Sequence, residues 1–210
     1  MGRYLGSSCK HCRREGVKLM LKGIRCDTAK CPVEKKQRNL APGMHGWRRS
    51  RASEYAVRLR EKQKVKRYYG LLDKQFMRYF HRAERARGNT GEILLELLER
   101  RLDNVVYKLN FAPSRKAARE LIAHGHIHLN GRKVDVSGYT TKIGDKVTVK
   151  NSDKSIKLVK QQLDSDPNFT TQSWLQLDRS KPGAAVVALP MRDDVQIPVE
   201  EQLVVEFCSR

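Results

Sequence analysis

Positive charge is concentrated in the first half of this 210-residue chain. Residues 1–100 contain 26 Lys and Arg against 10 Asp and Glu, whereas residues 101–210 contain 17 against 13, so the two halves carry +16 and +4. A compact first half would repel itself unless an anionic partner neutralised this charge. The charge therefore predicts a polyanionic partner, with nucleic acid as the first candidate and an anionic membrane surface as the second.

The length allows one large or two modest domains, and an apolar content of 39% is sufficient for a core. The sequence contains no apolar run of about 18 residues, the length of a membrane span. Its first residues also lack the apolar stretch of a secretory signal. We therefore expect a cytoplasmic protein, in a compartment where thiols stay reduced.

Four cysteines form two closely spaced pairs near the N-terminus. Cys9 and Cys12 are separated by two residues, and Cys26 and Cys31 by four. In a reducing compartment such pairs are more typical of metal sites than of disulfides. The spacing predicts one structural zinc ion held by these four cysteines, with an iron–sulfur cluster at the same residues as the alternative. The fifth cysteine, Cys208, is expected to be a small packed thiol.

The most basic stretch covers residues 53–69. Its Arg, Lys, Leu, Glu and Gln residues favour a helix, and Ser53 is a suitable N-cap. A merely solvated helix would intersperse more acids, so we predict RNA contacts for Arg58, Arg60, Lys62, Lys64, Lys66 and Arg67. The same charge argument extends to the N-terminal arm and the following loop, with Arg3, Arg13, Arg14, Arg48, Arg49 and Arg51. Trp47, beside these arginines, is expected to pack on a core or to stack on a sugar or base.

The remaining chain alternates helical and strand patterns. Asp73 and Ser114 are suitable N-caps, and the apolar residues after each recur at helical spacing. Asn130-Gly131 is typical of a type I′ hairpin turn between two short strands. These patterns predict an α+β fold with a largely helical first part.

Long motifs identify a family. The sequence RLDNVVYKLNFAPSRKAARELIAHGHIHLNGRKVD, continued by SGYTTKIGDKVTV, resembles the RNA-binding module named after ribosomal protein four of the small subunit. The sequences MGRYLG, PGMHG, SEYAVRLREKQKVKRYYG and EEQLVVEF, with the cysteine pairs, resemble the bacterial ribosomal proteins that carry this module. The resemblance covers nearly the whole chain.

The resemblance implies a domain organisation and an RNA surface. It implies an N-terminal arm at 1–45, where the cysteine spacing places the metal site, a helical domain at 46–100 rejoined by the tail 197–210, and an α/β domain at 101–196. The module itself would occupy about 101–150. The family's RNA surface falls here on Ser114, Arg115, Lys116, Arg119, His124, Gly125, His126, Asn130, Gly131, Arg132 and Lys133.

The resemblance also implies a function and partners. A protein of this family would be a structural, non-enzymatic constituent of the 30S small ribosomal subunit in the cytoplasm. It would bind the 5′ domain of 16S rRNA at a helix junction, nucleate ribosome assembly and contribute to translational accuracy. Its neighbours would be small-subunit proteins five and three, and mRNA at the channel through which it enters.

Two other classes of function remain open at this point. RNA-modifying enzymes and tyrosyl-tRNA synthetases use the same module, but the sequence shows no Ser/His/Asp order, nucleotide-binding glycine loop or paired carboxylates. RNA chaperones also carry the module, but they lack the cysteine arm and the long helical first domain. The motifs therefore favour the ribosomal protein.

Overall fold

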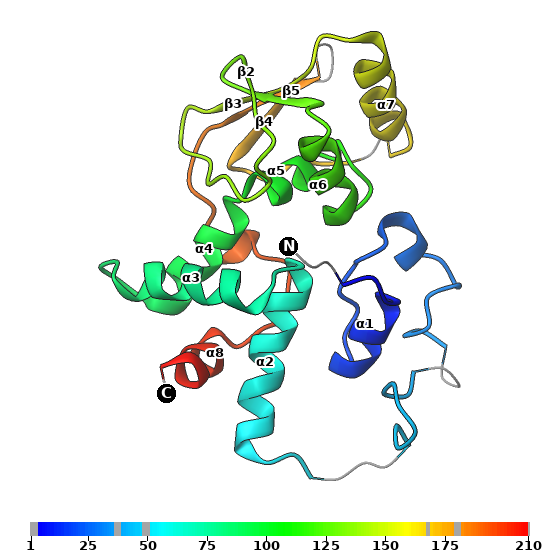
Figure 1. The fold of residues 1–210 in the computed structure, drawn as a ribbon, viewed down its shortest axis with the longest axis vertical. Helices are drawn as coiled ribbons and strands as arrows, with labels where there is room; N and C mark the ends of the chain where they lie inside the picture. Colours follow the sequence, from blue (N-terminus) through cyan, green and yellow to red (C-terminus); the bar gives the residue numbers. More distant parts are fainter. Residues whose placement is uncertain (1–3, 36–38, 48–50, 167–168, 179–181, 210) are drawn as a thin grey trace. The chain divides into compact units, whose positions relative to one another are not determined.

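The computed structural model of the chain describes residues 4–35, 39–47, 51–166, 169–178 and 182–209. The chain divides into two compact units, one formed by Met1–Phe76 with Ile197–Arg210 and the other by Met77–Gln196. Figure 1 labels most of the helices and strands of both units. Among the described residues, no helix is long and apolar enough to cross a membrane.

The first unit is helical. It contains α1 (Cys9–Glu15), the 3-10 helix η1 (Gly23–Cys26), α2 (Glu54–Tyr68), the start of α3 (Asp73–Glu84) and α8 (Glu201–Cys208). Ser53 begins α2 as predicted, because its hydroxyl accepts a hydrogen bond from the backbone N–H of Ala56.

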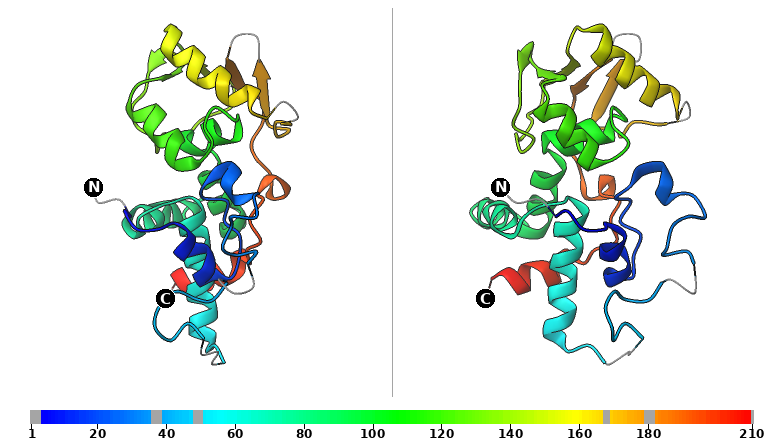
Figure 2. Two further views of the ribbon diagram at one scale, coloured as in Figure 1. Left: turned by 90° about the vertical axis from the view of Figure 1, so that its right-hand side faces the viewer. Right: turned by 45° about the vertical axis from the view of Figure 1, so that its right-hand side comes forward.

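The C-terminal helix α8 packs against α2, although the two are far apart in the sequence (Figures 1 and 2). The rings of Tyr55 and Phe207 lie 5.4 Å apart between centroids. Arg58 Nε donates a hydrogen bond to Glu206 Oε2 at 2.7 Å across the same contact. The tail is therefore an integral part of the first unit.

The second unit also contains helices. They are the rest of α3, α4 (Thr90–Glu99), α5 (Leu102–Lys108), α6 (Arg115–Ala123), α7 (Asp153–Asp164) and the 3-10 helix η2 (Arg192–Asp194). The backbone is extended at Arg101, so α4 and α5 are two separate helices. Asn110 follows α5 with a φ of 57°, the left-handed conformation that ends a helix.

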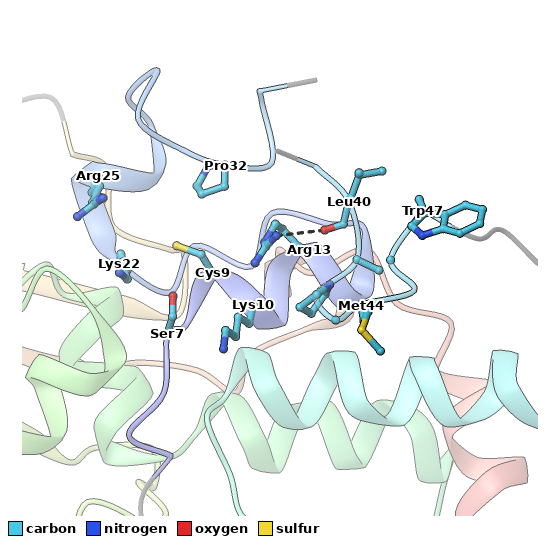
Figure 3. Close-up of a pocket in the computed structure, with 14 residues that line it drawn as sticks. Ser7, Cys9, Lys10, Arg13, Lys22, Arg25, Pro32, Leu40, Met44 and Trp47 are labelled. Atoms are coloured by element: carbon cyan, nitrogen blue, oxygen red, sulfur yellow. Dashed lines mark hydrogen bonds between the residues drawn. The ribbon is translucent and has the colours of Figure 1, made fainter. Parts of the chain in front are cut away.

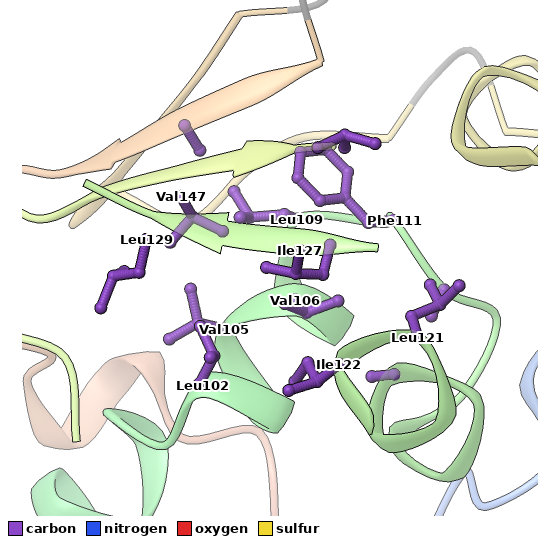
Figure 4. Close-up of a cluster of buried hydrophobic side chains, with 14 of the residues drawn as sticks. Leu102, Val105, Val106, Leu109, Phe111, Leu121, Ile122, Ile127, Leu129 and Val147 are labelled. Carbon is purple, nitrogen blue, oxygen red and sulfur yellow. The ribbon is translucent and has the colours of Figure 1, made fainter. Parts of the chain in front are cut away.

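The second unit also contains an antiparallel sheet with strand order β2-β1-β3-β5-β4. The strands are β1 (Ile127–Leu129), β2 (Arg132–Lys133), β3 (Lys146–Val149), β4 (Leu175–Asp178) and β5 (Gly183–Val186). Side chains on one face of the central strands pack against α5 and α6, as Figure 4 shows. This core includes Val105, Val106, Leu121, Ile122, Ile127, Leu129 and Val147.

The fold confirms a mixture of helices with a small antiparallel sheet. It does not confirm the metal-binding function that the sequence predicts for the N-terminal arm, as the cysteine geometry below explains.

Candidate nucleic-acid interface

The basic helix α2 is less available to a partner than its sequence suggests. Each of its six predicted RNA-binding cations forms an ion pair with a carboxylate of the same unit. Their side chains are between 10% and 37% exposed. These cations are Arg58, Arg60, Lys62, Lys64, Lys66 and Arg67. Much of the positive charge of α2 therefore serves to hold the first unit together.

Asp73 is one of these carboxylate partners. Lys62 and Lys66, one helical turn apart on α2, each place Nζ 3.1 Å from Asp73 Oδ1. Burial alone would raise the pKa of Asp73, but the hydrogen bonds from Lys66 and Lys62 outweigh it and lower that pKa. The carboxylate thus stays charged and fastens the start of α3 to α2.

Glu15 is a second partner and connects α1 to α2. Its carboxylate contacts Arg67, and its Oε1 lies 3.6 Å from Arg60 Nη1. The side chain is fully buried, and this burial raises the pKa of Glu15, while the charges of Arg67 and Arg60 oppose the shift. The pairing positions the N-terminal arm on the basic helix.

The other predicted RNA-binding cations of the arm and the following loop differ in their contacts and exposure. Arg13 Nη1 and Arg14 Nη2 donate to the backbone carbonyls of Leu40 and Pro42, at 3.3 and 2.7 Å. Arg51 is exposed. Arg3, Arg48 and Arg49 lie outside the described residues.

The four N-terminal cysteines are free thiols that line a cavity of only about 10 Å³. Burial raises the pKa of the Cys12 and Cys26 thiols, although backbone hydrogen bonds oppose the shift.

The predicted metal site is wrong. Within the described ranges, no group of three or more His, Cys, Asp or Glu side chains is arranged to hold a metal ion. This finding overturns both the zinc ion and the alternative iron–sulfur cluster at Cys9, Cys12, Cys26 and Cys31. The spacing correctly predicted that the four cysteines lie close together, but they line one small cavity as free thiols.

In the second unit, the predicted RNA contact Arg119 points to a buried carboxylate. Its Nε donates to Asp103 Oδ2 at 2.6 Å, and Arg101 Nη2 donates to the same oxygen at 2.8 Å. Burial alone would raise the pKa of Asp103, but the charges of Arg101 and Arg119 outweigh it and lower that pKa. This network fixes α6 against the start of α5.

Arg115 is likewise turned inward and is only 7% exposed. Its Nε donates to Asn104 Oδ1 at 2.8 Å, and its guanidinium carbon lies 4.5 Å from the centroid of the Tyr107 ring. Asn104 in turn donates to Glu99 Oε2 at 2.6 Å. The first residue of α6 is therefore anchored on α5.

A cluster of two histidines, a glycine and a lysine forms where α6 ends, with His124 and Lys133 exposed. Gly125 has a φ of +72°, and an added Cβ there would lie 2.5 Å from Lys133 Cε, so the lysine side chain lies directly over the glycine. The rings of His124 and His126 are stacked, with centroids 6.3 Å apart and planes inclined by 20°. His126 Nδ1 lies 2.9 Å from Ser155 Oγ, which orients this ring. We call His124, Gly125, His126 and Lys133 the histidine–lysine cluster.

The hairpin turn beside this cluster is confirmed. Asn130 and Gly131 have φ values of 50° and 78°, as a type I′ turn requires. The Asn130 amide is held on both sides, because its Oδ1 accepts from the backbone N–H of Lys146 and its Nδ2 donates to Asp145 Oδ1, both at 2.8 Å. This rigid turn presents Arg132 to solvent.

The remaining predicted residues of this surface lie on the first turn of α6. Ser114 caps the helix, since its hydroxyl accepts from the backbone N–H of Ala117 at 3.3 Å. Lys116 is exposed. The solvent-facing cations of the predicted set in this unit are therefore Lys116, Arg132 and Lys133.

The prediction from sequence missed one group of arginines on and after α3. Phe80 and Ala83 bury one face of this helix. The opposite face and the following turn expose Arg78, Arg82, Arg85 and Arg87. In the described part of the chain none of these four forms an ion pair with a carboxylate, in contrast to the cations of α2. Their spacing of four and three residues, opposite the apolar stripe, would have identified them.

Comparisons with known proteins identify the family of the chain. Residues 3–99 match the family described as "Ribosomal protein S4/S9 N-terminal domain", and residues 100–147 match the "S4 domain". The chain is 51% identical to the "Small ribosomal subunit protein uS4" of Halothermothrix orenii and 49% identical to that of Thermoanaerobacter sp. (strain X514). It is 50% identical to the "Small ribosomal subunit protein uS4A" of Symbiobacterium thermophilum. Each match covers 210 residues and 100% of both chains.

These matches confirm the resemblance found in the sequence motifs and exclude the enzyme reading. The chain belongs to the uS4 family of small ribosomal subunit proteins, which are structural constituents of the ribosome with an RNA-binding domain.

Proposed function

We propose that the protein is a primary binder of 16S rRNA that docks on the helix junction of the 5′ domain. The observation that carries this proposal is the exposed cationic surface of the S4 domain, where the histidine–lysine cluster lies beside the turn that presents Arg132. Such a surface suits phosphates that converge at a junction, because cations and turns contact the backbone without reading its sequence.

The predicted RNA-binding residues divide into two proposed roles. Exposed cations, such as Lys116, Arg132 and Lys133, contact phosphates directly, and Arg78, Arg82 and Arg85, on and just after α3, form a second group of exposed cations with the same role. Paired cations, such as Arg115 and Arg119, act as positioning residues that hold α6 in place. The cations of α2 position α1, α3 and α8 in the same way.

The finer biological assignments follow from the family resemblance. We propose that binding to the 5′ domain nucleates 30S assembly, because a protein that fixes helices at a junction prepares the surface that later proteins recognise. In the finished subunit the proposed neighbours are proteins five and three and the incoming mRNA, and the proposed effect is on translational accuracy. We also propose that the chain divides by function into the arm 1–45, the helical domain 46–100 with the tail 197–210, and the α/β domain 101–196 that contains the RNA-binding module.

Titration of a 16S 5′-domain transcript tests the proposal. The full chain should bind this transcript more tightly than a transcript of equal length from another domain of the same RNA. If about six phosphates are contacted, affinity should fall about a thousandfold between roughly 50 and 200 mM salt. Equal binding of both transcripts, or an affinity that salt does not change, would contradict the proposal.

A further inference from the structure

An open groove of about 630 Å³ lies in the first unit, between α1, η1 and the segment 40–47 (Figure 3). Its outer wall is fixed to α1, because Arg13 and Arg14 donate to the carbonyls of Leu40 and Pro42. The groove adjoins the small cavity between the cysteine thiols, with which it shares Cys9, Lys22 and Pro32. Its volume lies within the range of sites for small ligands, about 300–1,000 Å³.

The groove is cationic. Lys10, Arg13, Lys22 and Arg25 line it, and no carboxylate does so among its lining residues. The nearby acids Glu34 and Asp27 pair instead with Lys18, which does not line the groove. The charge of the groove therefore favours an anionic ligand over a cationic one.

One rim of the groove is apolar and open to solvent. Met44 and Trp47 are 86% and 64% exposed, and Leu40 is 44% exposed. Figure 3 shows Lys22 and Arg25 at one end of the groove and Met44 and Trp47 at the other, with Arg13 between them. A ligand that spans the groove must therefore combine a negative end with a flat or apolar one.

We propose that the groove binds an unpaired nucleotide of an RNA strand, with its phosphate held by the cations and its base stacked against Trp47. An unpaired base offers the aromatic face that a base in a duplex has already used in stacking. Every base has such a face, so the site would accept different bases at similar affinity. The inference rests on the proposed function, because that function supplies RNA as the partner.

Tryptophan fluorescence of the full chain tests this site directly. The chain has two tryptophans, and Trp174 is only 1% exposed, so a ligand that stacks in the groove quenches chiefly Trp47. The probes are hexauridylate, an RNA duplex of equal length, uridine monophosphate, and phosphatidylglycerol vesicles. We expect hexauridylate to quench Trp47, and the duplex to quench it far less.

Matched variants extend the test to affinity, measured by the anisotropy of labelled hexauridylate. Trp47→Ala should weaken binding about tenfold, the usual effect of losing one base stack. Met44→Ala should weaken it less, and the control Met191→Ala, at a residue 75% exposed in the other unit, should leave it within about twofold. All three side chains are exposed, so none of these variants is expected to unfold the protein.

Several results would overturn the site. The first is an equal affinity of the Trp47→Ala and Met191→Ala variants for hexauridylate. The second is equal quenching of Trp47 fluorescence by the duplex and by hexauridylate. The third is quenching by free uridine monophosphate or by vesicles when hexauridylate causes none. If the chain binds the 5′-domain transcript but hexauridylate does not change Trp47 fluorescence, only the inference about the groove fails. If it binds neither RNA, the proposed function fails with it.

Discussion

At the scale of single residues, Asp103 connects two parts of the second unit. It accepts hydrogen bonds from Arg101, beside it in sequence, and from Arg119 on α6. The side chains of Asp103 and Arg101 are only 2% and 1% exposed. Without the carboxylate, the Arg101 charge would stay buried with no counter-charge. Because Arg119 positions α6, the network links the stability of the unit to the shape of the proposed RNA surface.

Replacing this carboxylate should destabilise the second unit. Asp103→Asn is expected to lower the free energy of unfolding by about 3–5 kcal/mol at neutral pH, because it leaves buried arginines unpaired. Urea unfolding, followed by Trp174 fluorescence in a Trp47→Phe background, measures the change. The control Asp135→Asn replaces an exposed acid and should change stability by less than about 0.5 kcal/mol. Equal effects of the two variants would contradict the role of Asp103.

The same carboxylate predicts a pH dependence. The pKa of Asp103 is lowered on folding, so its stabilising contribution is present above the ordinary carboxyl pKa of about 3.9 and is lost as pH falls through the lower folded value. The stability difference between the natural chain and Asp103→Asn should therefore shrink only below about pH 4. A difference that is constant down to acid unfolding would be inconsistent with this assignment.

Cys208 provides a second test at this scale. Burial raises the pKa of its thiol to about 11, so very little thiolate exists at pH 8. Alkylation by iodoacetamide at pH 8 should therefore be at least about a hundredfold slower at Cys208 in the folded chain than in denaturing urea. Mass spectrometry of the tryptic peptide measures both rates, and comparable rates would refute the burial of this thiol.

Sequence patterns correctly predicted the conformations that depend only on neighbouring residues in the chain. The caps at Ser53 and Ser114 and the Asn130-Gly131 turn are of this kind. The inward direction of Arg119 could not be predicted, because its partner Asp103 is 16 residues away and on another helix. The cysteine spacing failed for a related reason: spacing indicates which thiols meet, but the fold of the intervening loop decides whether their sulfurs surround a metal ion, and in the described residues they do not.

At the scale of elements, the composition of α2 and α3 is a poor guide to which helix has exposed cations. The highly basic α2 uses its cations to hold α1, α3 and α8, whereas the arginines that α3 exposes have no carboxylate partner among the described residues. The sequence correctly predicted both helices, since their residue types and caps are local properties. It could not predict which helix would find acids nearby, because Glu15 and Glu206 come from distant segments.

Neutralising α3 should weaken RNA binding more than neutralising another basic helix. The variant Arg78→Gln, Arg82→Gln, Arg85→Gln is expected to lower the slope of log affinity against log salt by about 2 units, because each phosphate contact contributes about 0.7–0.9. The binding is measured by titration of the 5′-domain transcript.

The helix α7 offers a charge-matched control in the same unit. Lys154, Lys157 and Lys160 are exposed on it, and their triple replacement by Gln removes the same charge. We expect this control to leave the salt slope nearly unchanged. Equal losses in both variants would indicate an effect of net charge alone and would exclude a specific role for α3.

At the scale of the whole molecule, the sequence predicted the class of partner but not where it binds. A net charge of +20 indicates a polyanion whatever the fold, and long motifs identified the family. The distribution of exposed cations required the structure, because the cations of α2 are paired with carboxylates whereas the arginines of α3 are exposed. The proposed contacts therefore lie on exposed cations of each unit, supported by buried networks that hold those surfaces in shape.

The most direct test of the central claim is co-sedimentation with small ribosomal subunits in stringent salt. The account predicts that the full chain joins subunits lacking their own copy of this protein, remains bound at about one copy per particle, and is lost when the 5′-domain fragment competes for it. Recovery of the chain at the top of the gradient, with no binding to that fragment at low salt, would contradict the account.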